Sequence, residues 1–164
     1  MSEIDLNKLE YVEDEGFQGE IKADFLGTTV KPILIIQTED DKIDDIQYES
    51  YNKLIENWDK IQHNVIKKVL DYYNDEEKGS YGPDDKEEFD RWWPEINTIS
   101  EMEKQIELDG IIIPYASMMD DVYSGRCVYL TFSKKYGEDI DDYGIGVQII
   151  NEEIKKIGYK DIAF

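Results

Sequence analysis

Apolar side chains recur at spacings of three and four residues along one long stretch of the chain, which is typical of one face of an α-helix. These positions are Leu54, Ile55, Trp58, Ile61, Val65, Ile66, Val69 and Leu70. The pattern predicts a single helix of about 28 residues, roughly 40 Å long, beginning at a cap on Asp44 or Asp45 and ending near Tyr72. Because one stripe of this helix is apolar, we expect it to lie across a sheet.

Short β-branched and aromatic runs, bounded by turn residues, predict strands on both sides of this helix. Before it, residues 17–24 and 29–38 form a predicted hairpin, with Pro32 on an edge strand or near the start of its strand. After it, the predicted strands are residues 111–114 and 126–133, and a hairpin of residues 144–150 with 154–159.

A second, shorter helix is predicted after Thr98 or Ser100, because both residues begin a capping-box pattern and Ile99, Met102 and Ile106 share one face. With both helices in the middle of the element order, the sequence predicts an α+β fold. We expect an antiparallel sheet of about six strands, with one long helix and one short helix packed on one face.

The predicted organisation is a single domain over residues 1–164. We expect a flexible N-terminus over residues 1–15 and an exposed acidic loop over residues 74–92, where Gly79, Gly82 and Pro83 interrupt the helical pattern. Of the adjacent Trp92 and Trp93, one is expected to be buried.

Charge is the unusual property of this composition, because 39 acidic residues outnumber 18 Lys and Arg and give a net charge of −21. Such a field repels nucleic acid and anionic lipid and attracts cationic partners. The acids form two blocks, residues 1–45 and 74–109, each with 13 acidic and 4 basic residues, around a neutral segment 46–73. No targeting or membrane-spanning pattern occurs, and the single cysteine suits a reducing compartment, so we expect a cytoplasmic protein.

Catalytic and metal-binding candidates are few. A zinc cage needs several His or Cys ligands, and the chain has one His63 and one Cys127. We expect His63 on the helix surface and Cys127 as a buried, unreactive thiol in a strand. We therefore predict no catalytic residues, no cofactor and no metal site.

Two acidic stretches resemble a calcium-binding EF-hand loop, but neither of them matches its residue pattern. The stretch from Asp139 has Tyr143 at the fifth position, and the stretch from Asn74 has Lys78 there. The alternative left open is weak divalent binding at Asp139, Asp141 and Asp142. The Gly144-Ile-Gly146 sequence lacks a third glycine and a following helix, so we expect these glycines to relieve packing or mark a bulge.

Aromatic residues interleaved with acids are the feature that best suggests a binding function. Rings supply contact energy at an interface, and carboxylates supply association rate and selectivity for a basic protein partner. The alternative is that these aromatic residues belong to the core beneath a solubilising acidic surface. The predicted partner-binding residues are Tyr81, Asp84, Asp85, Glu87, Glu88, Phe89, Trp92, Trp93, Glu138, Asp139, Asp141 and Asp142.

Several sequence motifs resemble those of an uncharacterised family of small acidic bacterial domains. They are Trp93-Pro-Glu95-Ile96, Gly110-Ile-Ile-Ile-Pro114, Tyr143-Gly-Ile-Gly-Val147 and Gly158-Tyr-Lys-Asp161-Ile162. The resemblance extends over most of the chain from about Phe17. It implies a domain of unknown function related to toxin-immunity proteins. Family members carry a Trp-Asp-x-Glu-His-Gly group, but residues 133–143 lack both the Trp and the His, so no function resting on that histidine is expected.

Together these observations predict a non-enzymatic, acidic protein-binding module, and in particular an immunity protein that neutralises a basic toxin. One alternative is an inhibitor that mimics nucleic acid and occupies a DNA-binding protein. Another is a small metal-dependent hydrolase that uses the acid clusters. The sequence leaves open whether the protein is a monomer or a homodimer.

Overall fold

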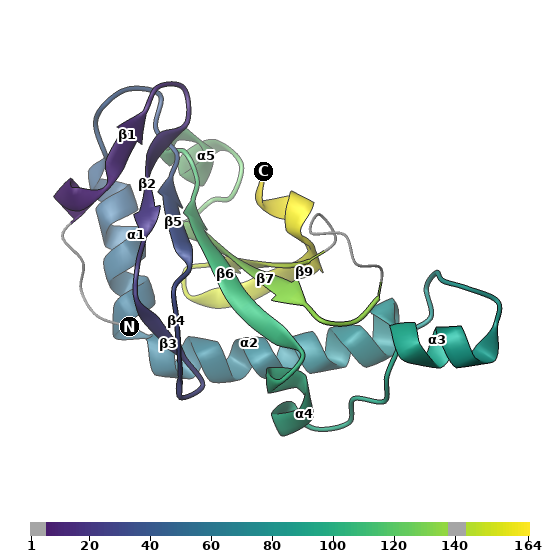
Figure 1. The fold of residues 1–164 in the computed structure, drawn as a ribbon. Helices are drawn as coiled ribbons and strands as arrows, with labels where there is room; N and C mark the ends of the chain where they lie inside the picture. Colours follow the sequence, from purple (N-terminus) through teal and green to yellow (C-terminus); the bar gives the residue numbers. More distant parts are fainter. Residues whose placement is uncertain (1–5, 138–143) are drawn as a thin grey trace.

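The computed structural model, which describes residues 6–137 and 144–164, contains a seven-stranded sheet and a separate two-stranded sheet (Figure 1). The large sheet has the order β1-β2-β5-β6-β7-β8-β9, and the small one pairs β3 with β4. The strands are β1 (Glu10–Val12), β2 (Gly16–Glu20), β3 (Ala23–Phe25), β4 (Thr28–Val30), β5 (Ile33–Ile36), β6 (Ile106–Ile113), β7 (Cys127–Lys134), β8 (Ile145–Ile150) and β9 (Glu153–Tyr159).

Helical segments connect the strands and cover the sheet. The α-helices are α1 (Asp45–Glu56), α2 (Trp58–Tyr72), α3 (Lys86–Trp92), α4 (Ile99–Glu103) and α5 (Ala116–Asp121). The shorter segments are the 3-10 turns η1 (Leu6–Lys8) and η4 (Lys160–Ala163) and the π-helical turn η2 (Tyr73–Glu77). None of the helices in the described ranges is long and apolar enough to cross a membrane.

The α+β class is as predicted, but the expected antiparallel sheet of six strands with two helices is wrong. Strands β5 and β6 pair in parallel, with Leu34 opposite Ile111, so the seven-stranded sheet is mixed. The chain between these two strands runs through α1, α2, α3 and α4, and this long crossover returns it to the same edge in the same direction. Helices α3 and α5 were not predicted, because both are short and lie in stretches rich in acids and turn residues.

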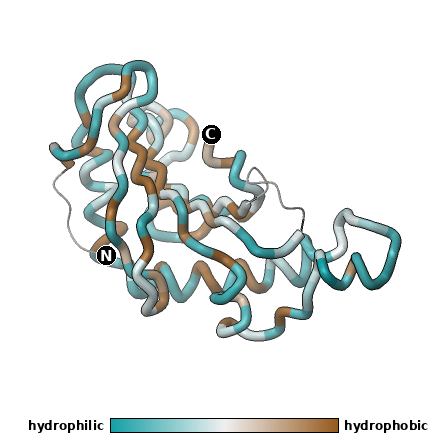
Figure 2. Tube along the Cα trace, in the orientation of Figure 1, coloured by the Kyte–Doolittle hydropathy of each residue, from teal (hydrophilic) through white to brown (hydrophobic). Residues whose placement is uncertain are grey.

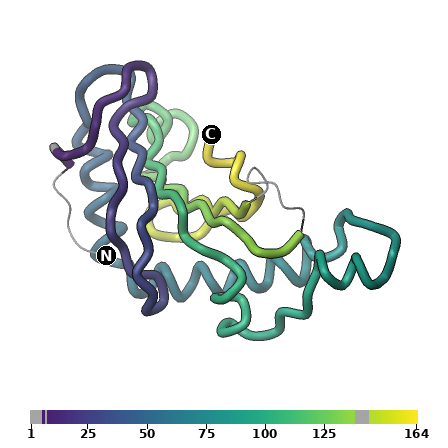
Figure 3. The backbone as a smooth tube through the Cα atoms, in the orientation of Figure 1, coloured from purple at the N-terminus to yellow at the C-terminus, as the bar shows by residue number. Residues whose placement is uncertain are grey.

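The predicted N-terminal hairpin is confirmed as one long, interrupted pairing (Figure 3). Phe17 of β2 lies opposite Ile36 of β5, and β3 and β4 continue the pairing beyond a short break. Pro32 lies in this break, directly before β5, where its carbonyl accepts a hydrogen bond from Ile21 N at 3.0 Å. The hairpin and the preceding β1 form one end of the large sheet, with β1 at its edge.

The single long helix predicted from the apolar periodicity is wrong in one respect, since it is divided at Asn57 into α1 and α2, which run in different directions (Figure 1). The Asn57 side-chain amide donates to Lys53 O at 2.9 Å and competes with the helical backbone pattern. Trp58 then donates from its indole nitrogen to Asp24 O at 2.7 Å, which fixes the start of α2 against the N-terminal hairpin. The predicted cap at Asp44 is confirmed, with Gln47 accepting from its backbone N–H at 3.0 Å.

Both faces of the sheet are covered at its centre, because every residue of β7 from Cys127 to Phe132 is buried. Helices α1 and α2 cover one face and η4 packs on the other, and apolar colours follow the central strands in Figure 2. A Cβ at Gly146 would lie 2.8 Å from Ile162 Cγ1, so this glycine relieves packing as predicted. The bulge in this hairpin lies at Gln148 and Ile149 instead.

The short-helix prediction holds at its start, where Thr98 Oγ1 accepts from Glu101 N at 3.1 Å. The helix ends at Glu103, however, and Ile106, which was assigned to its apolar face, is the first residue of β6. The predicted strand at 126–133 and the C-terminal hairpin are confirmed as β7 and as β8 with β9. Asn151 and Glu152 form the two-residue hairpin turn with φ angles of 49° and 66°.

Candidate protein-binding surface

Residues 74–92 form an acidic arm that projects from the body of the molecule, with α3 at its far end (Figure 1). This is the segment that the sequence predicted as a loop, and it contains most of η2 and the whole of α3. The chain reverses at Gly79 and Gly82, whose φ angles of 75° and 138° suit glycine. Asp85 then caps α3 by accepting from Glu87 N at 3.1 Å.

The aromatic residues of the arm and the adjoining Trp93 mainly hold the arm against the body. Trp93 is buried, with 2% of its surface exposed, and its indole N–H donates to Tyr81 O at 2.8 Å. The Tyr81 ring centroid lies 5.3 Å from that of Trp93 and 5.9 Å from that of Trp92. Trp93 is therefore not available to a partner, whereas Tyr81, Phe89 and Trp92 are half-buried. The expectation that one of the two tryptophans is buried is confirmed.

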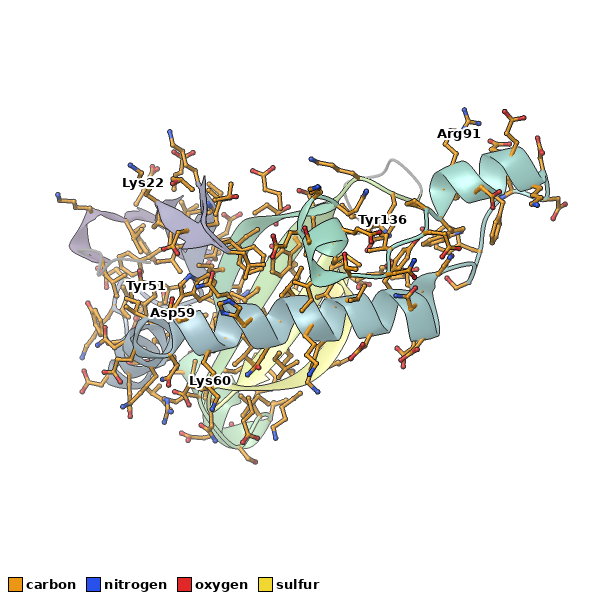
Figure 4. The ribbon with its side chains drawn as sticks, turned by 90° about the horizontal axis from the view of Figure 1, so that it is seen from below. Lys22, Tyr51, Asp59, Lys60, Arg91 and Tyr136 are labelled. Carbon is orange, nitrogen blue, oxygen red and sulfur yellow. The ribbon has the colours of Figure 1, made fainter. Side chains whose placement is uncertain are left out.

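A buried ion pair lies beneath the base of the arm, joining η2 to the end of β7. Lys134 Nζ lies 2.9 Å from Glu77 Oε2, and the two side chains are 3% and 0% exposed. Tyr136 donates from its hydroxyl to the second carboxylate oxygen of Glu77 at 3.0 Å. Burial and the neighbouring Glu77 carboxylate raise the pKa of Tyr136, so the hydroxyl keeps its proton and remains a donor. Figure 4 labels Tyr136 at this junction, with Arg91 farther out on α3.

Aromatic rings surround the ammonium group of Lys134. Its Nζ lies 5.2 Å from the ring centroid of Tyr136, 5.3 Å from that of Tyr159 and 5.8 Å from that of Trp93. A cation enclosed by a carboxylate and aromatic faces is stabilised both by charge and by the ring quadrupoles. The ion pair therefore fixes the arm to the sheet, and sequence analysis missed it because Glu77 and Lys134 each resemble ordinary surface charges.

Apart from the buried Glu77, the carboxylates of the arm are exposed or half-exposed. The segment carries eight acidic and three basic residues, and it appears mostly in hydrophilic colours in Figure 2. Of the predicted binding residues, Asp84, Asp85 and Glu87 are exposed and Glu88 is half-exposed. A fixed, projecting surface of this kind can meet a basic protein with little rearrangement.

The other four predicted binding residues, Glu138, Asp139, Asp141 and Asp142, lie outside the described residues. Gly137, which directly precedes them, donates from its backbone N–H to Trp92 O at 2.7 Å, so it is tied to the end of the arm.

A second acidic surface, which sequence analysis did not predict, forms where the β1–β2 turn meets the β5–α1 loop. Tyr11 lies there with 38% of its surface exposed. Desolvation raises the pKa of its hydroxyl, and the charges of Asp41, Glu13 and Asp14 raise it further, so these carboxylates act on the same hydroxyl. The two acidic stretches are far apart in the sequence, and only the pairing of β2 with β5 brings them together.

The residues with catalytic potential lie apart from these surfaces. Cys127 is buried as predicted, and burial raises the pKa of its thiol to about 12. His63 is exposed on α2, as predicted, with Nδ1 2.6 Å from Asp59 O. Among the described residues, no three His, Cys, Asp or Glu side chains are grouped so that they could hold a metal ion.

Comparison with known proteins places the chain in a family. Residues 5–133 match the family model described as a domain of unknown function (DUF6985). No curated protein and no solved structure matches the chain. The motifs at residues 143–147 and 158–162 that suggested a resemblance lie beyond the matched region. Because the match spans well over half of the chain, the chain belongs to the DUF6985 family of domains of unknown function.

Proposed function

We propose that this protein is a non-enzymatic module that binds a basic protein partner through the acidic arm. The observation that carries the proposal is the rigid attachment of the arm, in which the Glu77–Lys134 ion pair and the buried Trp93 hold exposed carboxylates clear of the body. A surface fixed before binding loses little conformational entropy on association. Its negative field also accelerates the encounter with a cationic partner.

The partner class that best matches this surface is a basic toxin, which would make the protein an immunity protein. A toxin that degrades nucleic acid needs a basic active site to bind its polyanionic substrate. An acidic protein with a net charge of −21 is complementary to such a site and can occlude it.

The test is a calorimetric titration against purified basic nuclease toxins, with acidic enzymes of similar size as the comparison. We expect binding to at least one basic toxin at about 50 mM salt, and weakening of about tenfold or more at about 500 mM salt because the charges are screened. Co-expression of this protein should protect cells from the toxin that it binds. Binding that does not depend on salt, or cells that die in spite of co-expression, would contradict the proposal.

A further inference from the structure

Strand β9 is an open edge of the seven-stranded sheet. It has β8 on one side and no strand on the other in the described structure. Lys160 N donates to Gly144 O at 3.1 Å, and the alternation of an antiparallel pair then directs the backbone of Ile157 away from β8. An edge with outward backbone donors and acceptors can accept a further strand.

A groove of about 340 Å³ runs along this edge, between β9 and the C-terminal half of α2. Helix α2 contacts β9, and Figure 4 shows the yellow strand running beside it. Lys155 and Lys156 of β9 line the groove. Its apolar part consists of Ile154 and Ile157 on the strand, with Tyr72 across from them on α2. All three are half-buried, so the groove combines an open backbone edge with a partly apolar floor.

The helix wall of the groove is acidic. Asp71, Asp75 and Glu76 line it and are exposed, and Lys68 is the lysine on this wall. An added strand would direct every second side chain toward this wall. Basic residues at those positions would face three carboxylates.

Lys155 and Lys156, which line the groove on β9, limit which segments it can accept. Lys155 pairs with Glu153 at 2.9 Å, which leaves its charge partly compensated. Lys156 precedes Gly158 by two residues and so directs its side chain to the face where Ile162 packs on that glycine. Basic side chains on that face of an added strand would be repelled. If two β9 edges paired, the same lysines would lie opposite one another and repel. This repulsion disfavours a second copy of this chain as the occupant of the groove.

We propose that this groove receives an extended segment of the basic partner, which adds to β9 as a further strand and is basic at alternate positions only. The inference rests on the proposed function, because the groove adjoins the base of the acidic arm and both would contact the same protein. Main-chain hydrogen bonds to β9 would supply affinity, and the acidic wall would select the pattern of the segment.

The probes are three synthetic peptides of about nine residues, the length of a typical long strand. One alternates lysine with threonine, the second has the same composition in the order Lys-Lys-Thr-Thr, and the third is the alternating peptide with N-methyl groups on every second amide. Binding to isotope-labelled full-length protein is followed by NMR at low salt. We expect the alternating peptide to shift the amide signals of residues 154–157, and the two control peptides to bind about tenfold more weakly or less.

Two charge-matched variants separate the groove from the arm. D71K/D75K reverses the groove wall, where Asp75 lies at the base of the arm, and D84K/D90K reverses exposed residues in the outer part of the arm, with the same change in net charge. Lysines near the end of α2 also suit the helix dipole, so the groove variant should fold. We expect D71K/D75K to weaken the alternating peptide about tenfold and D84K/D90K less than about threefold.

The outcomes distinguish the groove from the wider proposal. Equal binding of all three peptides, or equal loss in both variants, would overturn strand addition and leave an acidic surface that binds by charge alone. No peptide binding, together with binding of a folded basic toxin, would also overturn the groove and leave the proposed function standing. No binding of peptide or toxin would contradict both.

Discussion

At the scale of single residues, the most consequential contact joins Glu77 to Lys134 across 57 positions of the sequence. A sequence pattern cannot identify such a pair, because a lysine and a glutamate in polar stretches usually lie in solvent. Their burial depends on the π-helical turn that brings Glu77 under the arm and on the end of β7. Cys127 is the opposite case, since its position within an apolar strand was enough to predict burial.

Removing one member of the buried pair should destabilise the fold strongly. K134M leaves the Glu77 carboxylate buried without its cation, and we expect a loss of about 3–5 kcal/mol in the free energy of unfolding. Urea denaturation measures this loss in the free energy of unfolding, and K135M is the control because Lys135 is exposed. The double variant E77Q/K134M should lose less than the sum of the single variants. A cost for K134M no greater than that for K135M would show that the pair does not hold the arm.

The thiol of Cys127 should be unreactive in the native protein. Its pKa of about 12 keeps it protonated at pH 8, so a thiol reagent should label it only after urea unfolds the chain. The raised pKa also means that the unfolded state loses this proton first as pH rises. The protonated thiol therefore makes its full contribution to the free energy of unfolding below about pH 8.5. This contribution is lost as the pH rises toward the pKa of the thiol in the folded state. Rapid labelling of the folded protein would contradict this account.

At the scale of elements, sequence patterns predicted the features that depend only on neighbouring residues. The cap at Thr98, the C-terminal hairpin around Asn151 and the apolar stripe of α2 are all properties of neighbouring residues. The break at Asn57 depends instead on the contact of Trp58 with Asp24 in a distant hairpin, so the uninterrupted periodicity hid it. Helix α3 is too short and too acidic to give an apolar stripe.

The C-terminal turn η4 should depend on the glycine beneath it. In G146A the new Cβ would lie 2.7 Å from Tyr159 O and 2.8 Å from Ile162 Cγ1, so η4 must shift. We expect a loss of about 1–3 kcal/mol and faster amide hydrogen exchange over residues 160–163. G19A is the control, because its Cβ would meet the movable end of the Leu9 side chain. Unchanged exchange in G146A would show that η4 does not rest on this glycine.

At the scale of the whole molecule, composition predicted the acidity and the order of the predicted elements predicted the α+β class, while strand order and surface shape required the structure. The parallel pairing of β5 with β6 depends on how four helices return the chain to the sheet, and no local signal specifies that path. The same path separates the arm from the second acidic surface around Tyr11. The acids therefore form distinct surfaces, and of these only the arm was predicted.

We attribute binding of the partner to the arm and not to the overall charge of the molecule. The most direct test compares D84K/D90K with E103K/E107K, in which all four residues are exposed and both changes alter the net charge equally. Affinity for a bound basic toxin, measured by calorimetry at about 50 mM salt, should fall about tenfold or more in the arm variant. In the control variant it should fall less than about threefold. Equal losses in the two variants would contradict the claim and assign the binding to diffuse charge.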